Sequence, residues 1–98
     1  QNLQHETVQR YFLENDSQTI ATEMPVYGDD EAGNVDIVRV TVEGRIQLLD
    51  FKPDAHKEKN VSGQLYGYAK LLSKQTGIPM SMIDLFYFDG DKTYQVIL

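Results

Sequence analysis

The fold is decided by residues 35–52, which read VDIVRVTVEGRIQLLDFK. The β-branched run from Val35 to Val42 predicts one strand, and Arg45 to Phe51 predicts the strand that returns beside it. Glu43-Gly44 is the predicted hairpin turn between them. The stretch therefore predicts an antiparallel pair whose second strand ends on an acid followed, two residues later, by a lysine.

The pairing of these two strands brings acidic side chains together. With the turn centred within Glu43-Gly44, Asp36 is predicted to lie opposite Phe51 and one step from Asp50. Asp50 and Lys52 are two residues apart, so their side chains leave the strand on the same face. These residues alone favour a surface ion pair, worth about 0–1 kcal/mol. Two acids and a lysine at the mouth of a sheet also suit a divalent cation, and the rest of the chain shifts the preference toward that interpretation.

The chain before the hairpin predicts one helix and one edge strand. Gln1 to Glu14 has the periodicity of an amphipathic helix, with Asn2 as its N-cap. The predicted apolar stripe consists of Leu3, Val8, Tyr11, Phe12 and Leu13. Thr19 to Tyr27 is rich in β-forming residues, and Pro25 cannot donate to a ladder, which indicates an edge strand or a strand with a break. Residues 28–34 predict an acidic polar loop.

The chain after the hairpin predicts a second helix. A charged loop, residues 53–59, leads to Asn60 or Ser62 as the N-cap, and the helix runs to about Thr76 before Gly77 stops it. The predicted buried stripe consists of Val61, Leu65, Tyr68, Ala69 and Leu72. Gln64 and Tyr68 are one helical turn apart, so we expect both on the core-ward side.

Two further strands complete the predicted sheet. Ser81 to Phe88 and Thr93 to Leu98 are β-rich, and Asp89-Gly90-Asp91 joins them in a turn. The predicted order is α-β-β-β-α-β-β, an α+β fold in which helices flank a central mixed sheet. Residues 1–98 form a single domain or a fragment of a larger chain.

Composition excludes several classes of function. The chain has no cysteine, which excludes disulfides and thiolate chemistry. No apolar run approaches the roughly 18 residues of a membrane span, and no signal peptide is visible, so we expect a cytoplasmic protein without a membrane partner. The net charge of −6 argues against a broad basic surface that coats nucleic acid. Positive charge gathers instead around one stretch that contains His56. Its lysines are Lys52, Lys57, Lys59, Lys70 and Lys74.

Six side chains, taken in chain order, carry a recognisable pattern. They are Glu6, Asp36, Asp50, Lys52, Gln64 and Tyr68, and the last four stand in the motifs Asp50-Phe51-Lys52 and Gln64-Leu65-Tyr66-Gly67-Tyr68. The set resembles the PD-(D/E)XK nuclease superfamily, whose members have an acid in the first helix, an Asp on the second strand and D/E-x-K on the third. Many branches add Q-x-x-x-Y on the next helix. The resemblance covers nearly the whole chain and is nearest to the RecB-like exonucleases and to the N-terminal nuclease domain of type I restriction endonuclease motor subunits.

Two positions depart from the pattern of the superfamily. Val35 stands before Asp36, where the strict motif has proline. The first acid is ambiguous, because Glu6 fits the helical position while Glu23 lies on the first predicted strand, and Glu6 is favoured.

The resemblance implies a metal-dependent nuclease that hydrolyses phosphodiester bonds of DNA in restriction, repair or recombination. Asp36, Asp50 and the backbone carbonyl of Phe51 would coordinate Mg²⁺ or Mn²⁺, with help from Glu6. The resemblance assigns Lys52 to orienting a water or stabilising the transition state, and Gln64 and Tyr68 to supporting the site. It also implies nucleic acid as partner, a helicase or motor domain in the same chain or complex, and a homodimer.

Two other interpretations stay open. A catalytically inactive nucleic-acid-binding or assembly module agrees with the low net charge, but the complete acid–acid–lysine set argues against it. A generic α+β domain with no nuclease ancestry needs all the placements to coincide. His5 and His56 are interpreted as surface residues rather than ligands. Tyr66 and Tyr87 are interpreted as packing residues rather than platforms for bases.

Overall fold

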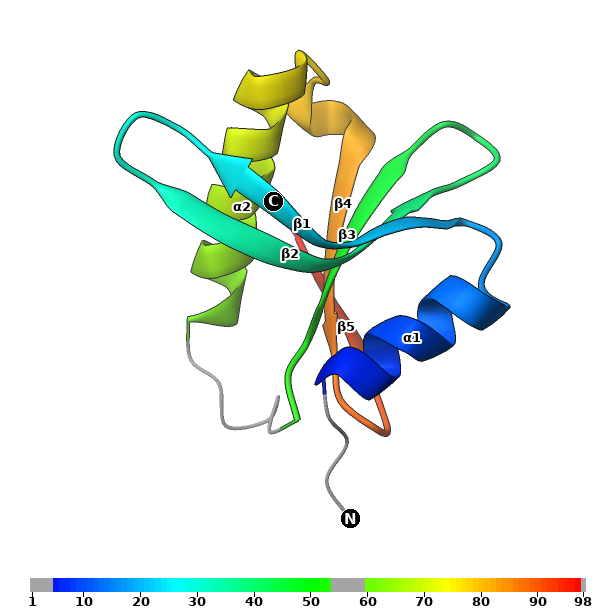
Figure 1. Cartoon of the computed structure of the whole chain (residues 1–98). Helices are drawn as coiled ribbons and strands as arrows, with labels where there is room; N and C mark the ends of the chain where they lie inside the picture. Colours follow the sequence, from blue (N-terminus) through cyan, green and yellow to red (C-terminus); the bar gives the residue numbers. More distant parts are fainter. Residues whose placement is uncertain (1–4, 54–59, 98) are drawn as a thin grey trace.

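The protein folds as a five-stranded mixed sheet with one helix on each face, seen here in a computed structural model that describes residues 5–53 and 60–97 (Figure 1). Its elements are α1 (His5–Asn15), β1 (Thr19–Tyr27), β2 (Ala32–Val40), β3 (Ile46–Phe51), α2 (Val61–Thr76), the short 3₁₀ helix η2 (Met80–Met82), β4 (Ile83–Phe88) and β5 (Thr93–Val96). The predicted α+β class and the order α-β-β-β-α-β-β are confirmed. Neither α1 nor α2, the two α-helices of this described part, is long and apolar enough to cross a membrane.

The strands lie in the order β1-β2-β3-β4-β5. Every neighbouring pair is antiparallel except β3 and β4, which run parallel. Parallel neighbours cannot be joined by a tight turn, so the chain crosses over through α2. β1 is an edge strand, as Pro25 predicted, and β3 lies at the centre.

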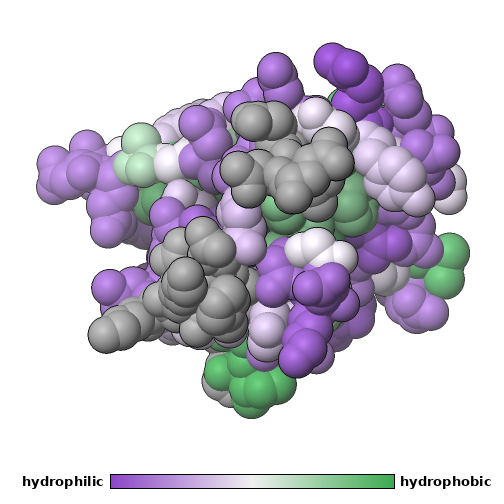
Figure 2. All heavy atoms as spheres, turned by 90° about the horizontal axis from the view of Figure 1, so that it is seen from below, coloured by the Kyte–Doolittle hydropathy of each residue, from purple (hydrophilic) through white to green (hydrophobic). Residues whose placement is uncertain are grey.

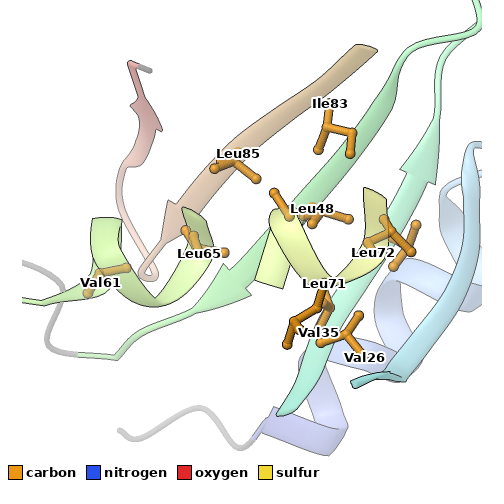
Figure 3. Close-up of a cluster of buried hydrophobic side chains, with 11 residues drawn as sticks. Val26, Val35, Leu48, Val61, Leu65, Leu71, Leu72, Ile83 and Leu85 are labelled. Carbon is orange, nitrogen blue, oxygen red and sulfur yellow. The ribbon is translucent and has the colours of Figure 1, made fainter. Parts of the chain in front are cut away.

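Helix α2 covers one face of the sheet and α1 covers part of the other (Figure 1). The larger core lies beneath α2 (Figure 3) and consists of Val26, Val35, Val38, Leu48, Val61, Leu65, Ala69, Leu71, Leu72, Ile83 and Leu85. The smaller core lies beneath α1 and consists of Val8, Ile37, Leu49 and Phe51, with Phe12, Phe86 and Phe88 packed against them. Burying an aliphatic or aromatic side chain of this size stabilises the fold by about 1.5–3 kcal/mol. The two cores therefore bury β3 on both faces of the sheet.

The first helix turns a narrower apolar face to the sheet than its sequence predicted. Val8 is buried and Phe12 packs against the smaller core, but Tyr11 and Leu13 are 63% and 53% exposed. Gln9 is buried instead. Positions 8 and 12 are one turn apart and set the rotation of the helix, which carries positions 11 and 13 away from the sheet. The predicted Asn2 cap and Leu3 lie outside the described residues.

Several predicted boundaries also move. β2 begins inside the predicted polar loop, at Ala32, and η2 occupies the start of the predicted strand at Ser81. Asn60 stands at the N-cap of α2 without a side-chain cap hydrogen bond. The helix ends as predicted at Gly77, whose φ of 81° is left-handed and whose N–H donates to the Ser73 carbonyl at 2.8 Å.

Candidate active site

Asp36 and Asp50 face each other at the open end of the β2–β3 ladder. The observed pairs include Ile37 with Leu49, so the same register places Asp36 opposite Asp50. The predicted partner, Phe51, was wrong by one residue.

The error lies in the turn between the strands, which spans three residues, 42–44, rather than the predicted Glu43-Gly44 centre. The Thr41 N–H donates to the Arg45 carbonyl at 2.9 Å across it. Gly44 takes a left-handed φ of 87°, a conformation that glycine adopts without strain. Val42, predicted to lie in the strand, is 87% exposed at this turn.

At the position of the two acids, backbone N–H groups donate to carboxylate oxygens of the opposite strand instead of to its backbone carbonyls. The Phe51 N–H donates to Asp36 Oδ2 at 2.9 Å, and the Asp36 N–H donates to Asp50 Oδ1 at 3.4 Å. Each carboxylate is therefore tied to the other strand by a backbone donor. This arrangement holds the two acids side by side before any ligand binds.

Asp50 carries an unfavourable charge in this position. It is only 3% exposed because β3 is covered on both faces. Burial raises the pKa of Asp50, the neighbouring Asp36 carboxylate raises it further, and Lys52 partly opposes both effects. A site that disfavours two negative charges gains free energy when a cation enters.

An ion pair and two hydrogen bonds connect Asp50 to side chains of α2. Lys52 Nζ lies 3.7 Å from Asp50 Oδ2 and donates to Gln64 Oε1 at 3.1 Å. Gln64 Nε2 then donates to the Tyr68 hydroxyl at 2.9 Å. Gln64 is exposed rather than core-ward, whereas Tyr68 is half-buried as expected. Burial and the Asp50 carboxylate raise the pKa of Tyr68, so its phenol stays protonated at neutral pH.

A glycine on β2 makes room for the tyrosine. A Cβ at Gly33 would stand 2.4 Å from Cε1 of the Tyr68 ring, closer than any real contact. The ring can therefore approach the strand this closely only because residue 33 has no side chain. Sequence reasoning gave no role to Gly33, since nothing local signals a contact with a helix 35 residues further along.

The helix residue that reaches the site is His5 and not Glu6. His5 Nε2 lies 2.9 Å from the Phe51 carbonyl oxygen, to which its N–H can donate, and 3.6 Å from Asp36 Oδ2. The imidazole also meets the Phe51 ring edge to face at 5.1 Å. Glu6 follows on the exposed side of α1. His5 keeps half of its side chain exposed, at 51%, as expected of a surface residue, and it also contacts the candidate site.

The other acid considered for the first motif, Glu23, is exposed on β1. It lies between the residues paired with Val35 and Ile37, and so flanks Asp36. Its φ of 49° is left-handed, which costs a non-glycine residue about 1 kcal/mol or more. His56, Lys57 and Lys59 lie outside the described residues.

The donor set fits a hard divalent cation. The carboxylates of Asp36 and Asp50 lie side by side, and His5 Nε2 lies 3.6 Å from Asp36 Oδ2 and 2.9 Å from the Phe51 carbonyl oxygen. Carboxylate and carbonyl oxygens are the ligands that Mg²⁺ and Mn²⁺ prefer. Within residues 5–53 and 60–97, no three His, Cys, Asp or Glu side chains are already gathered as a metal cluster. Asp36 and Asp50 are the described acids that could hold a cation there, together with backbone oxygen and water.

Comparison with known proteins identifies a shared fold. No family model and no curated protein matches the chain. The structure is similar to the crystal structure of a repair endonuclease from Pyrococcus abyssi, with a TM-score of 0.61 and 19% sequence identity. The match covers 89% of this chain but 38% of that protein's chain. At this level of identity the similarity concerns the fold.

Proposed function

We propose that this chain is a nuclease domain of the PD-(D/E)XK type, which hydrolyses phosphodiester bonds with the help of a divalent cation. The observation that carries the proposal is the tied pair Asp36–Asp50, with Lys52 Nζ 3.7 Å from the buried acid. The fold shared with a repair endonuclease supports the same class of protein. DNA as substrate, and repair, restriction or recombination as context, belong to this proposal.

The residues that would hold the cation are Asp36, Asp50 and the carbonyl of Phe51. A bound Mg²⁺ or Mn²⁺ would lower the pKa of a water ligand and offset charge on the phosphate. We assign the helical donor to His5 in place of Glu6, because among the described residues of α1 it is His5 that contacts both Asp36 and the Phe51 carbonyl. An imidazole ligand suits Mn²⁺ better than Mg²⁺, so Mn²⁺ is the better probe.

Lys52 is the group assigned to the transition state. Its ammonium acts as a point charge near the buried acid, and the bond to Gln64 fixes its direction. The Tyr68 hydroxyl in turn accepts a hydrogen bond from Gln64, and the absence of a side chain at Gly33 leaves room for the tyrosine ring. A preoriented cation can stabilise charge as it develops on the phosphate without reorganising at that moment.

The proposal is tested by titrating the chain with Mn²⁺ in a calorimeter and by assaying cleavage of single-stranded and duplex DNA. We expect wild type to bind Mn²⁺ and cleave, and Asp50→Ala to lose both. Asp29→Ala is the matched control, because Asp29 is an exposed acid in the β1–β2 turn and its loss changes the net charge equally.

Two results would overturn the proposal. Asp50→Ala that still cleaves would remove the acid pair from the mechanism. If wild type binds DNA but does not bind Mn²⁺ and does not cleave, the result would instead favour the inactive binding module. The net charge of −6 and the match to 38% of a longer endonuclease chain both agree with such a module.

A further inference from the structure

An apolar hollow lies between α1 and the ends of β3 and β4, at the same end of the sheet as the acid pair. Its volume is about 280 Å³. The residues around it include Thr7, Val8, Tyr11, Phe51, Phe88 and Gly90. Figure 2 looks at the molecule from this end, where apolar surface shows in places within a largely hydrophilic face. The site described above makes no use of the hollow.

Phe51 joins the hollow to the candidate active site. Its carbonyl oxygen belongs to the proposed donor set and contacts His5, while its ring lines the hollow. The two locations are therefore the two sides of a single residue. A phosphate held through a divalent cation at Asp36 and Asp50 would place the adjoining nucleoside on the side of Phe51 where the hollow lies.

Aromatic rings form the walls of the hollow. The Phe51 and Phe88 rings lie 5.4 Å apart at an angle of 49° on its inner side. Tyr11 stands on its outer side and is 63% exposed, so this ring contributes little to the core. An exposed aromatic side chain above an apolar floor is the arrangement on which bases stack in single-strand binding proteins.

The chemistry of the rim selects the base rather than the phosphate. Asp89 lines the hollow, and its Oδ1 accepts from the backbone N–H groups of Asp91 and Lys92, at 2.7 and 2.8 Å. A carboxylate beside apolar walls repels a phosphate, whereas a neutral aromatic ring carries no charge that the carboxylate opposes. A volume just below the roughly 300–1,000 Å³ of whole ligand sites suits one flat ring system.

We propose that this hollow binds an unpaired nucleobase next to the phosphodiester that is held through the cation at Asp36 and Asp50. The proposal rests on the function proposed above and names its substrate more closely. A base stacked in a duplex cannot enter the hollow without leaving its partner, which costs a few kcal/mol. Single strands, flaps and frayed ends are therefore favoured over intact duplex.

The test measures binding by fluorescence anisotropy, with Ca²⁺ in place of Mg²⁺. The probes are a short labelled oligothymidylate and a strand of equal length made of abasic nucleotides, which keeps the phosphates and lacks the bases. We expect wild type to prefer the strand with bases, and Tyr11→Ala to lose affinity for that strand by about 5- to 150-fold, the range for one stacked base. Affinity for the abasic strand should stay the same.

Two variants keep the test specific. Tyr11→Phe retains the ring and should bind as wild type does. Tyr66→Ala removes another exposed tyrosine, on α2 and outside the lining of the hollow, and should change neither affinity. The proposal is overturned if wild type binds both strands equally, if Tyr11→Ala binds as wild type, or if Tyr66→Ala loses as much.

The Mn²⁺ titration separates this proposal from the nuclease assignment. Metal binding and cleavage that persist with no dependence on Tyr11 would overturn the base site and leave the nuclease. A chain that binds no Mn²⁺ and cuts no DNA, yet needs Tyr11 to distinguish the two strands, would overturn the nuclease and keep the base site.

Discussion

Two aspartates of this fold, Asp16 and Asp50, meet cations in opposite ways. Asp16 follows α1 and receives Arg39 Nε at 2.6 Å on one oxygen and Arg39 Nη2 at 3.3 Å on the other. The Thr19 hydroxyl also donates to it at 2.6 Å. These bonds lower the pKa of Asp16 to about 2. Asp50 has one lysine at 3.7 Å and a second acid beside it, and its pKa is raised.

The difference separates a charge that stabilises the fold from a charge that we propose is kept for binding a cation. Hydrogen bonds from Arg39 and Thr19 satisfy both Asp16 oxygens and tie α1 to β1 and β2. Ionised Asp50 lowers stability at every pH above its raised pKa, because burial and Asp36 oppose its charge. Perturbed acids of the second kind concentrate at functional sites.

The largest effect we expect comes from exchanging the cations of the two clusters for alanine. Lys52→Ala should lower the cleavage rate by about 10²–10³-fold, the usual cost of removing one transition-state donor, and leave Mn²⁺ binding nearly intact. Arg39→Ala should do the reverse, lowering the free energy of unfolding by about 1.5–3 kcal/mol while cleavage persists. Cleavage assays and urea unfolding of both variants check this. Normal cleavage by Lys52→Ala would contradict the assignment of Lys52 to catalysis.

The second prediction concerns acid stability. The pKa of Asp16 is about 2 when folded and 3.8 in its unperturbed state, so its contribution is complete above about pH 4 and is lost as the pH falls toward 2. The contribution is on the order of 2 kcal/mol. Wild type should therefore lose more stability than Asp16→Asn between pH 4 and pH 2 in urea unfolding. Parallel curves for the two proteins would contradict the Asp16–Arg39 assignment.

The sequence predicted the parts of this contrast that depend on local pattern. Alternation and turn residues located the strands, and the spacing of Asp50 and Lys52 placed both on one face of β3. Gln64 and Tyr68 are one turn apart, and in the structure Gln64 accepts from Lys52 and donates to Tyr68. Patterns of this kind depend only on the period of a strand or a helix.

What the sequence could not predict depends on register, rotation and close approach. One extra residue in the turn moved Asp36 from Phe51 to Asp50. The rotation of α1 follows from its packing on Phe88 and other distant residues, so His5 rather than Glu6 reached the site. The Asp16–Arg39 cluster joins residues 23 apart that share no motif. Such contacts are set by the whole fold and leave no local signal.

The smallest effect we expect is also the most direct test of the comparison. Asp50→Asn keeps the shape of the side chain and removes the buried charge beside Asp36, so without metal it should raise the free energy of unfolding by about 0.5–2 kcal/mol at pH 7. Asp16→Asn, the same change at the satisfied acid, should lower it.

Added Mn²⁺ should make wild type more stable to unfolding than Asp50→Asn, the reverse of the order without metal. The metal stabilises only the protein that binds it, by RT ln(1 + [Mn²⁺]/Kd). Urea unfolding of wild type and both asparagine variants, with and without Mn²⁺, measures all of these differences. If Asp50→Asn proved less stable than wild type without metal, Asp50 would be a structural acid like Asp16. The acid pair on β2 and β3 would then need no cation to explain it.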